Sequence, residues 1–107
     1  MTEATWVEVP GAAALAEGSM GTFLVDGFPL VIARLGGRLC AVEDRCSHDD
    51  GPLGEGALAG CEVVCPRHGA RFDMRDGRAT RMPAVSPILP VPVREESGKA
   101  FVDAGAL

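Results

Sequence analysis

The sequence predicts an all-β fold, an antiparallel sandwich or partly open barrel that carries a small subdomain at one end. Two observations support this prediction. Short apolar segments recur along the chain, and turn dipeptides that suit tight hairpins separate them. Prolines recur between residues 82 and 92, where they exclude a helix and disfavour a central strand. We expect the 107 residues to form a single domain, 1–107.

The first half of the chain is expected to form a short strand followed by two hairpins. The strand covers residues 6–9, and an alanine-rich turn or short helix follows at residues 10–18. Asp26-Gly27 and Gly36-Gly37 suit tight hairpin turns, because glycine accepts positive φ. The strands that these turns join are expected at residues 22–25, 30–35 and 38–42.

The second half is expected to hold shorter strands between more frequent turns. Gly60 joins two of these strands, and a turn at residues 75–77 follows a third. A last hairpin turns at Ser97-Gly98. The strands are expected at residues 57–59, 62–64, 70–73, 91–94 and 100–102.

Charge and composition exclude some classes of protein. A net charge of −5 argues against nucleic acid as a partner, since its binding needs a basic stripe. The acidic balance suits a partner with a basic patch, or it merely keeps a small protein in solution. Aromatic residues make up only 5% of the chain and tyrosine is absent, so the core must be built from Val, Leu, Ala and Ile.

The sequence gives no sign of export or of a membrane span. Met1 to Glu8 has no basic cluster and no long apolar stretch, so no signal peptide is expected. The best candidate for a span, Phe28 to Ala33, is too short to cross a bilayer. We therefore expect a cytoplasmic protein that contacts no membrane and keeps its four cysteines reduced.

Two short segments each place a cysteine and a histidine on a tight turn: Cys46-Ser47-His48 and Cys65-Pro66-Arg67-His68, with sixteen residues between them. Two sulfurs and two nitrogens can hold one tetrahedral zinc ion or a two-iron cluster. Most zinc knuckles pair like ligands, whereas each turn here mixes the two types. The pattern therefore favours a [2Fe-2S] centre with two cysteines on one iron and two histidines on the other.

These turns, with Gly51-Pro52-Leu53 after the first and Gly69 followed by Ala70-Arg71-Phe72-Asp73 after the second, resemble the Rieske-type ferredoxins. Those proteins are the small electron carriers of bacterial aromatic-ring dioxygenase systems. The resemblance implies one [2Fe-2S] cluster per chain in a cluster-binding subdomain over approximately residues 44–84. It also implies a third loop with a proline near the cluster, for which Pro83 is the best match. The implied ligands are Cys46, His48, Cys65 and His68.

The resemblance implies an electron carrier rather than an enzyme. His48 and His68 are the only histidines, so none remain for the mononuclear iron of a Rieske oxygenase. The implied partners are an NAD(P)H-dependent flavoprotein reductase and a terminal oxygenase, both in transient contact. Alternatives are a small Rieske subunit of a nitrite-reductase-like assembly and an accessory to iron-sulfur assembly. An alternative of another class is a zinc-stabilised interaction module.

Other residues near the turns receive a structural interpretation. Cys40 and Cys61 are expected to lie in strands as small buried residues without a metal role. The charged residues beside the turns could orient a partner or tune His48, but simple surface charge explains them as well. These charged residues are Arg45, Asp49, Asp50, Arg67 and Arg71.

The resemblance also implies a low reduction potential within the Rieske range. The high-potential Rieske proteins of respiratory complexes have a disulfide between the two ligand loops, and the matching positions here are Gly51 and Arg67. Those proteins also have a serine and a tyrosine hydroxyl bonded to the cluster, at the positions of Ala70 and Phe72. Without these hydrogen bonds the added electron is less stabilised, so we expect a potential of about −150 mV.

Overall fold

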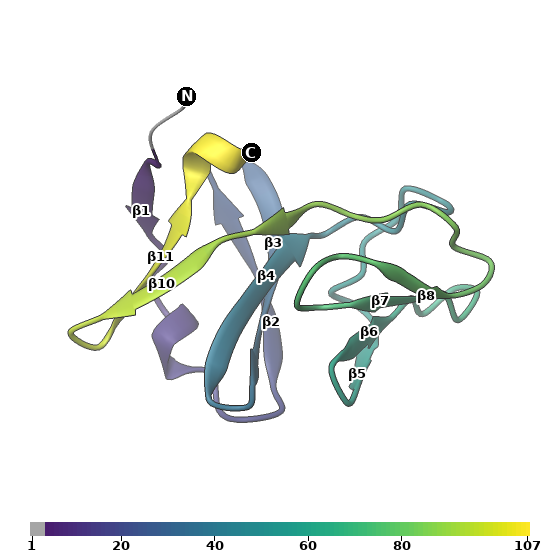
Figure 1. The fold of residues 1–107 in the computed structure, drawn as a ribbon, viewed down its shortest axis with the longest axis horizontal. Helices are drawn as coiled ribbons and strands as arrows, with labels where there is room; N and C mark the ends of the chain where they lie inside the picture. The colour runs from purple at the N-terminus through teal and green to yellow at the C-terminus, as the bar shows by residue number, and fades with distance from the viewer. Residues whose placement is uncertain (1–3) are drawn as a thin grey trace.

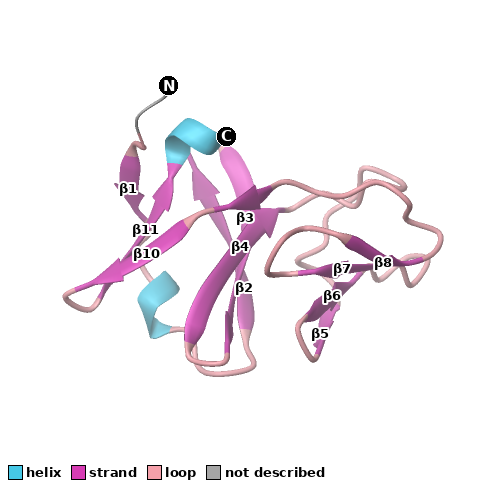
Figure 2. Cartoon of the chain, in the orientation of Figure 1, coloured by secondary structure: helices cyan, strands magenta, loops and turns pink. Residues whose placement is uncertain are grey.

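The computed structural model describes residues 4–107 and contains little regular structure other than strands (Figures 1 and 2). Two short 3-10 helices, η1 (Ala12–Ala14) and η2 (Ala104–Ala106), complete the regular elements. All neighbouring strands within the sheets are antiparallel, and the sheets do not close into a barrel. The structure therefore confirms the all-β antiparallel fold.

The strands form three sheets that follow one another along the molecule (Figure 1). The first has the order β1-β11-β10, with β1 (Trp6–Glu8), β10 (Val93–Glu96) and β11 (Lys99–Asp103). The central sheet has the order β2-β3-β4-β9, with β2 (Met20–Val25), β3 (Phe28–Leu35), β4 (Arg38–Glu43) and β9 (Pro90–Val91). The third has the order β5-β6-β7-β8, with β5 (Ala57–Ala59), β6 (Glu62–Val64), β7 (Arg71–Asp73) and β8 (Ala79–Arg81).

The expected hairpin turns have the backbone conformation that their residues favour. Asp26 and Gly27 have φ of 52° and 78°, and Ser97 and Gly98 have φ of 53° and 77°. Two successive positive φ angles match the twist of the flanking strands in a two-residue hairpin. These turns fix the registers of β2 with β3 and of β10 with β11.

Strand β3 is buried on both faces. Leu30 and Ile32 pack in a core shared by the first and central sheets, whereas Val31 and Ala33 pack in a second core under the third sheet. Alternate residues of a strand point to opposite faces, so the part of β3 that lies between the two cores, Leu30 to Ala33, is apolar at every position. Phe28 to Ala33, the segment that came nearest to a membrane span in the sequence, therefore belongs to an internal strand of the central sheet. Among the described residues, no helix is long and apolar enough to cross a bilayer.

The structure differs from the expected elements near the prolines and at several ends. The strand expected at residues 91–94 is two strands: β9 pairs with β4, and β10 pairs with β11. Pro92 separates them because it has no N–H to donate to either ladder. Strand β8 was not expected and pairs with β7. Strands β2 and β3 each begin two residues earlier than expected, at Met20 and Phe28.

Candidate metal centre

The first ligand turn follows β4 and closes on itself through its backbone. The N–H of Cys46 donates to the carbonyl of Gly51 at 2.8 Å, and the N–H of Asp50 donates to the carbonyl of Cys46 at 2.7 Å. Asp50 has φ of 62°, a left-handed conformation that aspartate tolerates better than most residues. The side chains from Cys46 to Asp49 therefore project from a compact loop.

The second ligand turn, between β6 and β7, repeats this construction. The N–H of Cys65 donates to the carbonyl of Ala70 at 2.7 Å, and the N–H of Gly69 donates to the carbonyl of Cys65 at 3.1 Å. Gly69 has φ of 76° at the position that corresponds to Asp50. The two loops therefore share a backbone construction, although the histidine follows the cysteine by two residues in the first loop and by three in the second.

The four predicted ligands meet as two layers. Cys46 and Cys65 are 0% and 1% exposed, and their sulfurs lie within 4.8 Å of each other. The rings of His48 and His68 are exposed and meet edge to face, with centroids 5.1 Å apart and an interplanar angle of 83°. The thiols thus form a buried inner layer, and the imidazoles form an outer layer at the surface.

This separation fits two metal ions better than one. A single tetrahedral zinc ion bonds sulfur at about 2.3 Å and nitrogen at about 2.0–2.1 Å, which brings all four donors within about 4 Å of one another. Across residues 4–107, two groups of three residues place their ligand atoms within 4.8 Å of one another. One group is Cys46, Cys65 and Asp49, and the other is His48, His68 and Asp49, so neither group contains both a cysteine and a histidine. The layers match a cluster with sulfur ligands on one iron and nitrogen ligands on the other.

Burial disfavours the charged, thiolate form of the inner layer. It raises the pKa of the Cys46 thiol above its usual value, while the backbone N–H groups of His48 and Asp49 oppose this by hydrogen bonding to the sulfur. A buried thiolate is costly without a nearby positive charge. A metal cation held by the two sulfurs would supply this charge and favour loss of the thiol protons.

Asp49 and Arg67 are not the simple surface charges that the sequence suggested. Their side chains are 19% and 30% exposed, and Arg67 Nε donates to Asp49 Oδ2 at 2.6 Å. The guanidinium and the Gly51 N–H hold the pKa of the Asp49 carboxyl well below its usual range. Neither turn alone predicts this pair, and the opposite charges of the two residues suggest it only once both turns are placed at one metal centre.

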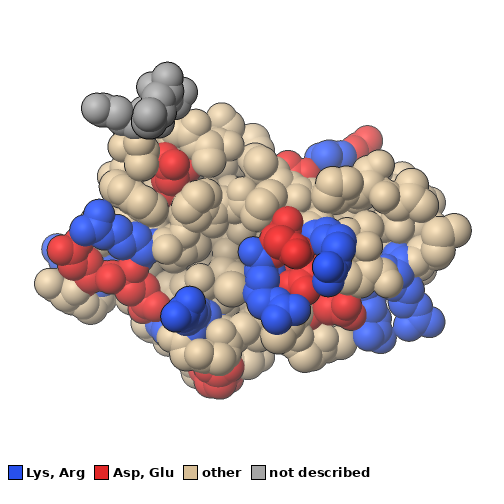
Figure 3. All heavy atoms as spheres, viewed as in Figure 1, with Lys and Arg blue, Asp and Glu red and all other residues tan. Residues whose placement is uncertain are grey.

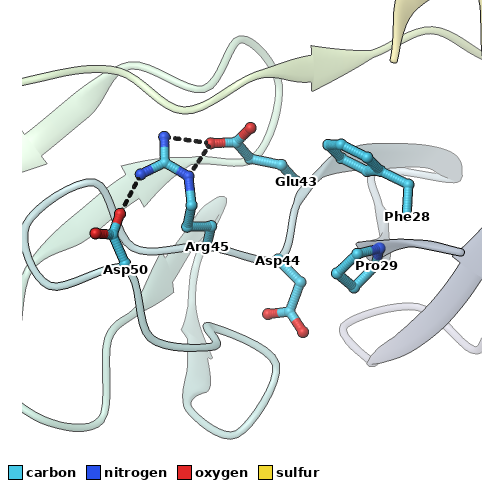
Figure 4. A pocket seen from close by; sticks show the side chains of 6 residues that line it. All are labelled: Phe28, Pro29, Glu43, Asp44, Arg45 and Asp50. Atoms are coloured by element: carbon cyan, nitrogen blue, oxygen red, sulfur yellow. Dashed lines mark hydrogen bonds and ion pairs between the residues drawn. The ribbon is translucent and has the colours of Figure 1, made fainter.

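Arg45 anchors the first ligand loop from its other side. It pairs with Glu43 at 2.9 Å and with Asp50 at 2.6 Å, beside a cavity of about 360 Å³ that Phe28 and Pro29 also line (Figure 4). Asp44, the third carboxylate there, accepts hydrogen bonds from the N–H groups of Leu53 and Gly54. The carboxylates of this pocket are already paired, so their role is to hold the loop.

The loop after β8 lies against the first ligand loop, at the same end of the molecule (Figure 1). Ser47 Oγ donates to the carbonyl of Ser86 at 2.6 Å. Pro83 lies in this loop, as expected, beside the buried Ala84. Met82 and Val85 are 71% and 77% exposed, which is unusual for large apolar side chains. The loop therefore adds an apolar surface near the ligand turns.

Cys40 and Cys61 lie outside the donor groups found among residues 4–107. Both are half-buried rather than fully buried, and Cys61 lies in the turn before β6 rather than in a strand. The expectation of buried strand residues was therefore wrong for Cys61 and overstated for Cys40. Burial nevertheless raises the pKa of the Cys40 thiol, which lowers its reactivity.

Ala70 and Phe72 are fully buried in the same core as the two cysteines. Neither side chain has a hydroxyl. The hydroxyl of Ser47, the residue after Cys46, donates to the carbonyl of Ser86 instead. The cysteines are thus surrounded at these two positions by apolar groups that give no hydrogen bond to sulfur.

The Rieske [2Fe-2S] domain matches residues 5–95, a span that includes both ligand turns and the sheets around them. The chain belongs to the Rieske [2Fe-2S] family. It is 44% identical over 84 residues to the ferredoxin component of the p-cumate 2,3-dioxygenase system of Pseudomonas putida, covering 78% of this chain and 71% of that protein.

Solved structures agree with this membership. The ferredoxin of carbazole 1,9a-dioxygenase from Nocardioides aromaticivorans IC177 superposes with a TM-score of 0.85 at 32% identity, over 92% of this chain and 96% of that one. A complex of reduced oxygenase and oxidized ferredoxin in carbazole 1,9a-dioxygenase contains a chain with a TM-score of 0.84 at 29% identity, over 94% of each. This Rieske protein therefore carries a [2Fe-2S] cluster and acts in electron transfer rather than as an enzyme.

Proposed function

We propose that this protein is a low-potential Rieske ferredoxin of a multicomponent oxygenase system. It carries single electrons in the cytoplasm from an NAD(P)H-dependent flavoprotein reductase to a terminal oxygenase. The observation that supports this most is the layer of exposed imidazoles above buried thiols, since an electron carrier needs its cofactor close to the surface. The dioxygenase ferredoxins to which the chain is similar support the choice of partners.

The proposed ligands are the four residues of the two layers. Cys46 and Cys65 bind one iron, and His48 and His68 bind the other, within a cluster-binding subdomain over approximately residues 44–84. When bound, the cluster accepts and donates one electron at a time. Neutral imidazole ligands raise its potential relative to a cluster with four thiolates, and the apolar Ala70 and Phe72 keep it at the low end of the Rieske range.

The surrounding residues protect one side of the site and leave the other open. Leu53, Phe72 and Met74 are fully buried in the core that contains the cysteines, so they exclude water from the sulfurs. His48 and His68 lie at the surface, where a partner's redox centre can approach. Met82 and Val85 supply an apolar contact surface on the adjacent loop. A small, partly apolar contact suits a partner that must leave after one electron.

Charge does not single out a docking face on the side of the molecule in Figure 3. Acidic and basic side chains lie intermixed over much of that face. Ion pairs such as Arg34 with Glu95 and Arg94 with Glu96 are examples of opposite charges that neutralise each other in this chain. A mixed surface steers a partner less than a surface of one sign. Shape and apolar contact at the ligand end therefore carry most of the recognition in this proposal.

Reconstitution of the electron path tests this function. The protein is mixed with a flavoprotein reductase and a terminal oxygenase recovered by co-purification, and oxidation of NAD(P)H is followed together with formation of the oxygenated product. We expect product formation to require this protein and to increase with its concentration until it saturates. Product formed at the same rate without it, or a protein that the reductase does not reduce, would contradict the proposal.

A further inference from the structure

Arg67 joins the two ligand loops through three hydrogen bonds. Its Nε donates to Asp49 Oδ2 at 2.6 Å, one terminal nitrogen donates to Asp49 Oδ1 at 3.1 Å, and the other donates to the carbonyl of Pro52 at 2.9 Å. Arg67 belongs to the second loop, whereas Asp49 and Pro52 belong to the first. The planar guanidinium and the carboxylate therefore pair in the two-point geometry that is strongest for this combination.

These bonds link two loops whose backbones close separately, beside a longer contact of 3.6 Å between His68 Nδ1 and Asp49 Oδ2. Each loop forms its own backbone hydrogen bonds, between Cys46 and Gly51 in the first loop and between Cys65 and Ala70 in the second. In the part of the chain that the structure describes, the hydrogen bonds from nitrogen donors that connect one loop to the other all come from Arg67. The relative position of the two loops decides whether the thiols and imidazoles form the observed layers.

Gly51 leaves the space that the guanidinium occupies. A Cβ atom at this position would lie 2.5 Å from Arg67 Cζ and 2.6–2.7 Å from two of its nitrogens. The guanidinium therefore lies directly on the backbone of the first loop. Gly51 also donates its N–H to Asp49 Oδ1 at 3.0 Å, which fixes the orientation of the carboxylate. A side chain at position 51 would move the guanidinium without removing either charge.

We propose that Arg67 and Asp49, seated over Gly51, form a clamp that positions the two ligand loops for cluster binding. This inference rests on the proposed ligand set. Asp49 is placed to act on both layers, because its carboxylate lies within 4.8 Å of the thiol pair and of the imidazole pair. Arg67 and Asp49 act as positioning residues through polar contacts between the loops.

Four variants test the clamp by different routes. Gly51→Ala displaces the guanidinium and keeps both charges, whereas Arg67→Gln and Asp49→Asn each remove one partner. The double variant Asp49→Asn/Arg67→Gln removes the pair but keeps the net charge of the parent. Arg94→Gln is the matched control, because Arg94 forms an ion pair with Glu96 at 3.1 Å in the first sheet, outside the ligand loops.

The measurement is the rate at which each anaerobically purified protein loses its visible absorption in the presence of an iron chelator. We expect Gly51→Ala, Arg67→Gln and Asp49→Asn to lose the cluster about tenfold faster than the parent or more, as for other residues that orient metal ligands. The double variant should be no worse than Arg67→Gln alone, since both partners act through one contact. Arg94→Gln should match the parent.

Voltammetry separates positioning from charge. Arg67→Gln removes a positive charge near the proposed ligands and should lower the potential, whereas the double variant should return close to the parent potential and still lose the cluster quickly.

Far-UV circular dichroism checks the fold, and Gly51→Ala keeps the test decisive if Arg67→Gln fails to fold. Parent-like loss rates in Gly51→Ala and Arg67→Gln would overturn the clamp alone. A parent without the absorption of a [2Fe-2S] cluster would overturn the proposed function, and the clamp with it.

Discussion

His48 and His68 meet edge to face at the surface, with ring centroids 5.1 Å apart, although they are twenty residues apart in the sequence. They come from two loops of similar backbone construction, each of which also supplies a buried cysteine. The arrangement gives a metal centre an enclosed thiol side and an open imidazole side. The expected ligand set and the approach of a redox partner both depend on this polarity.

The first prediction concerns the ligand set. Cys40→Ser and Cys61→Ser should keep the visible spectrum and the iron content of the parent, because neither thiol belongs to the donor groups of the described chain. Cys46→Ser and Cys65→Ser should lose most of both. Absorption spectra and iron analysis of the four purified variants make the comparison. Loss of iron in Cys40→Ser or Cys61→Ser would show that the assignment is wrong.

The second prediction concerns the reduction potential. Ala70→Ser and Phe72→Tyr should each raise it by some tens of millivolts, because a new hydroxyl donates to the cluster or its sulfur ligands more strongly after reduction. One electron corresponds to roughly 59 mV per tenfold change in equilibrium constant. Voltammetry on the parent, expected near about −150 mV, and on both variants gives the shifts directly.

Two results would contradict this explanation of the potential. A parent potential near the upper end of the Rieske range, about +300 mV, would show that Ala70 and Phe72 do not keep it low. Unchanged potentials in both variants, with intact clusters, would show that these two positions do not control it.

The third prediction concerns the loop after β8. Met82→Ser and Val85→Ser should each weaken binding to the terminal oxygenase by about 1 kcal/mol, or roughly fivefold in Kd, because both side chains are exposed on the loop tied to Ser47. The spectrum and potential should not change. Leu24→Ser is the control, since Leu24 is 72% exposed on β2. Equal effects of all three substitutions on the Kd would argue against a docking role for the loop.

The fourth prediction concerns acid stability. Asp73 is buried and accepts two side-chain hydrogen bonds from Arg75, which hold the pKa of its carboxyl below the usual value. A lowered folded-state pKa adds stability above the unfolded pKa of about 3.9, and this is lost as pH falls through the folded value. Asp73→Asn should therefore be less stable at pH 7 by about 1–3 kcal/mol.

Urea unfolding of both proteins across a pH series tests this linkage. The difference in free energy of unfolding between the parent and Asp73→Asn should be constant near neutral pH. It should become smaller in acid, because the parent then loses the contribution of the Asp73 ion pair. A difference that stays the same down to acidic pH would mean that the ionised form of Asp73 does not stabilise the fold.

Local signals in the sequence predicted much of this structure. The dipeptides Asp26-Gly27 and Ser97-Gly98 predicted hairpins because positive φ is a property of the turn itself. The spacing of cysteine and histidine predicted a two-metal centre because each turn holds its own pair. The confirmed all-β fold follows from the same kind of short-range pattern. The ligand roles themselves stay a prediction until the variants above are measured.

Features that depend on distant partners could not be predicted in this way. Pro92 indicates a break in the strand, but the local sequence does not show that β9 pairs with β4 while β10 pairs with β11. Asp49 and Arg67 are eighteen residues apart and look like surface charges until the loops are brought together. Cys61 directly precedes Glu62, where the expected strand begins, yet it lies in the turn before β6.

Nitrogen hyperfine spectroscopy on protein labelled with ¹⁵N only in histidine tests the central claim most directly. The chain has two histidines, so every labelled nitrogen belongs to His48 or His68. In the reduced protein, the account predicts a paramagnetic cluster coupled to two ¹⁵N-imidazole ligands, and coupling to one in His48→Ala or His68→Ala wherever the cluster survives. A reduced cluster without ¹⁵N coupling, or a colourless protein that holds zinc, would contradict it.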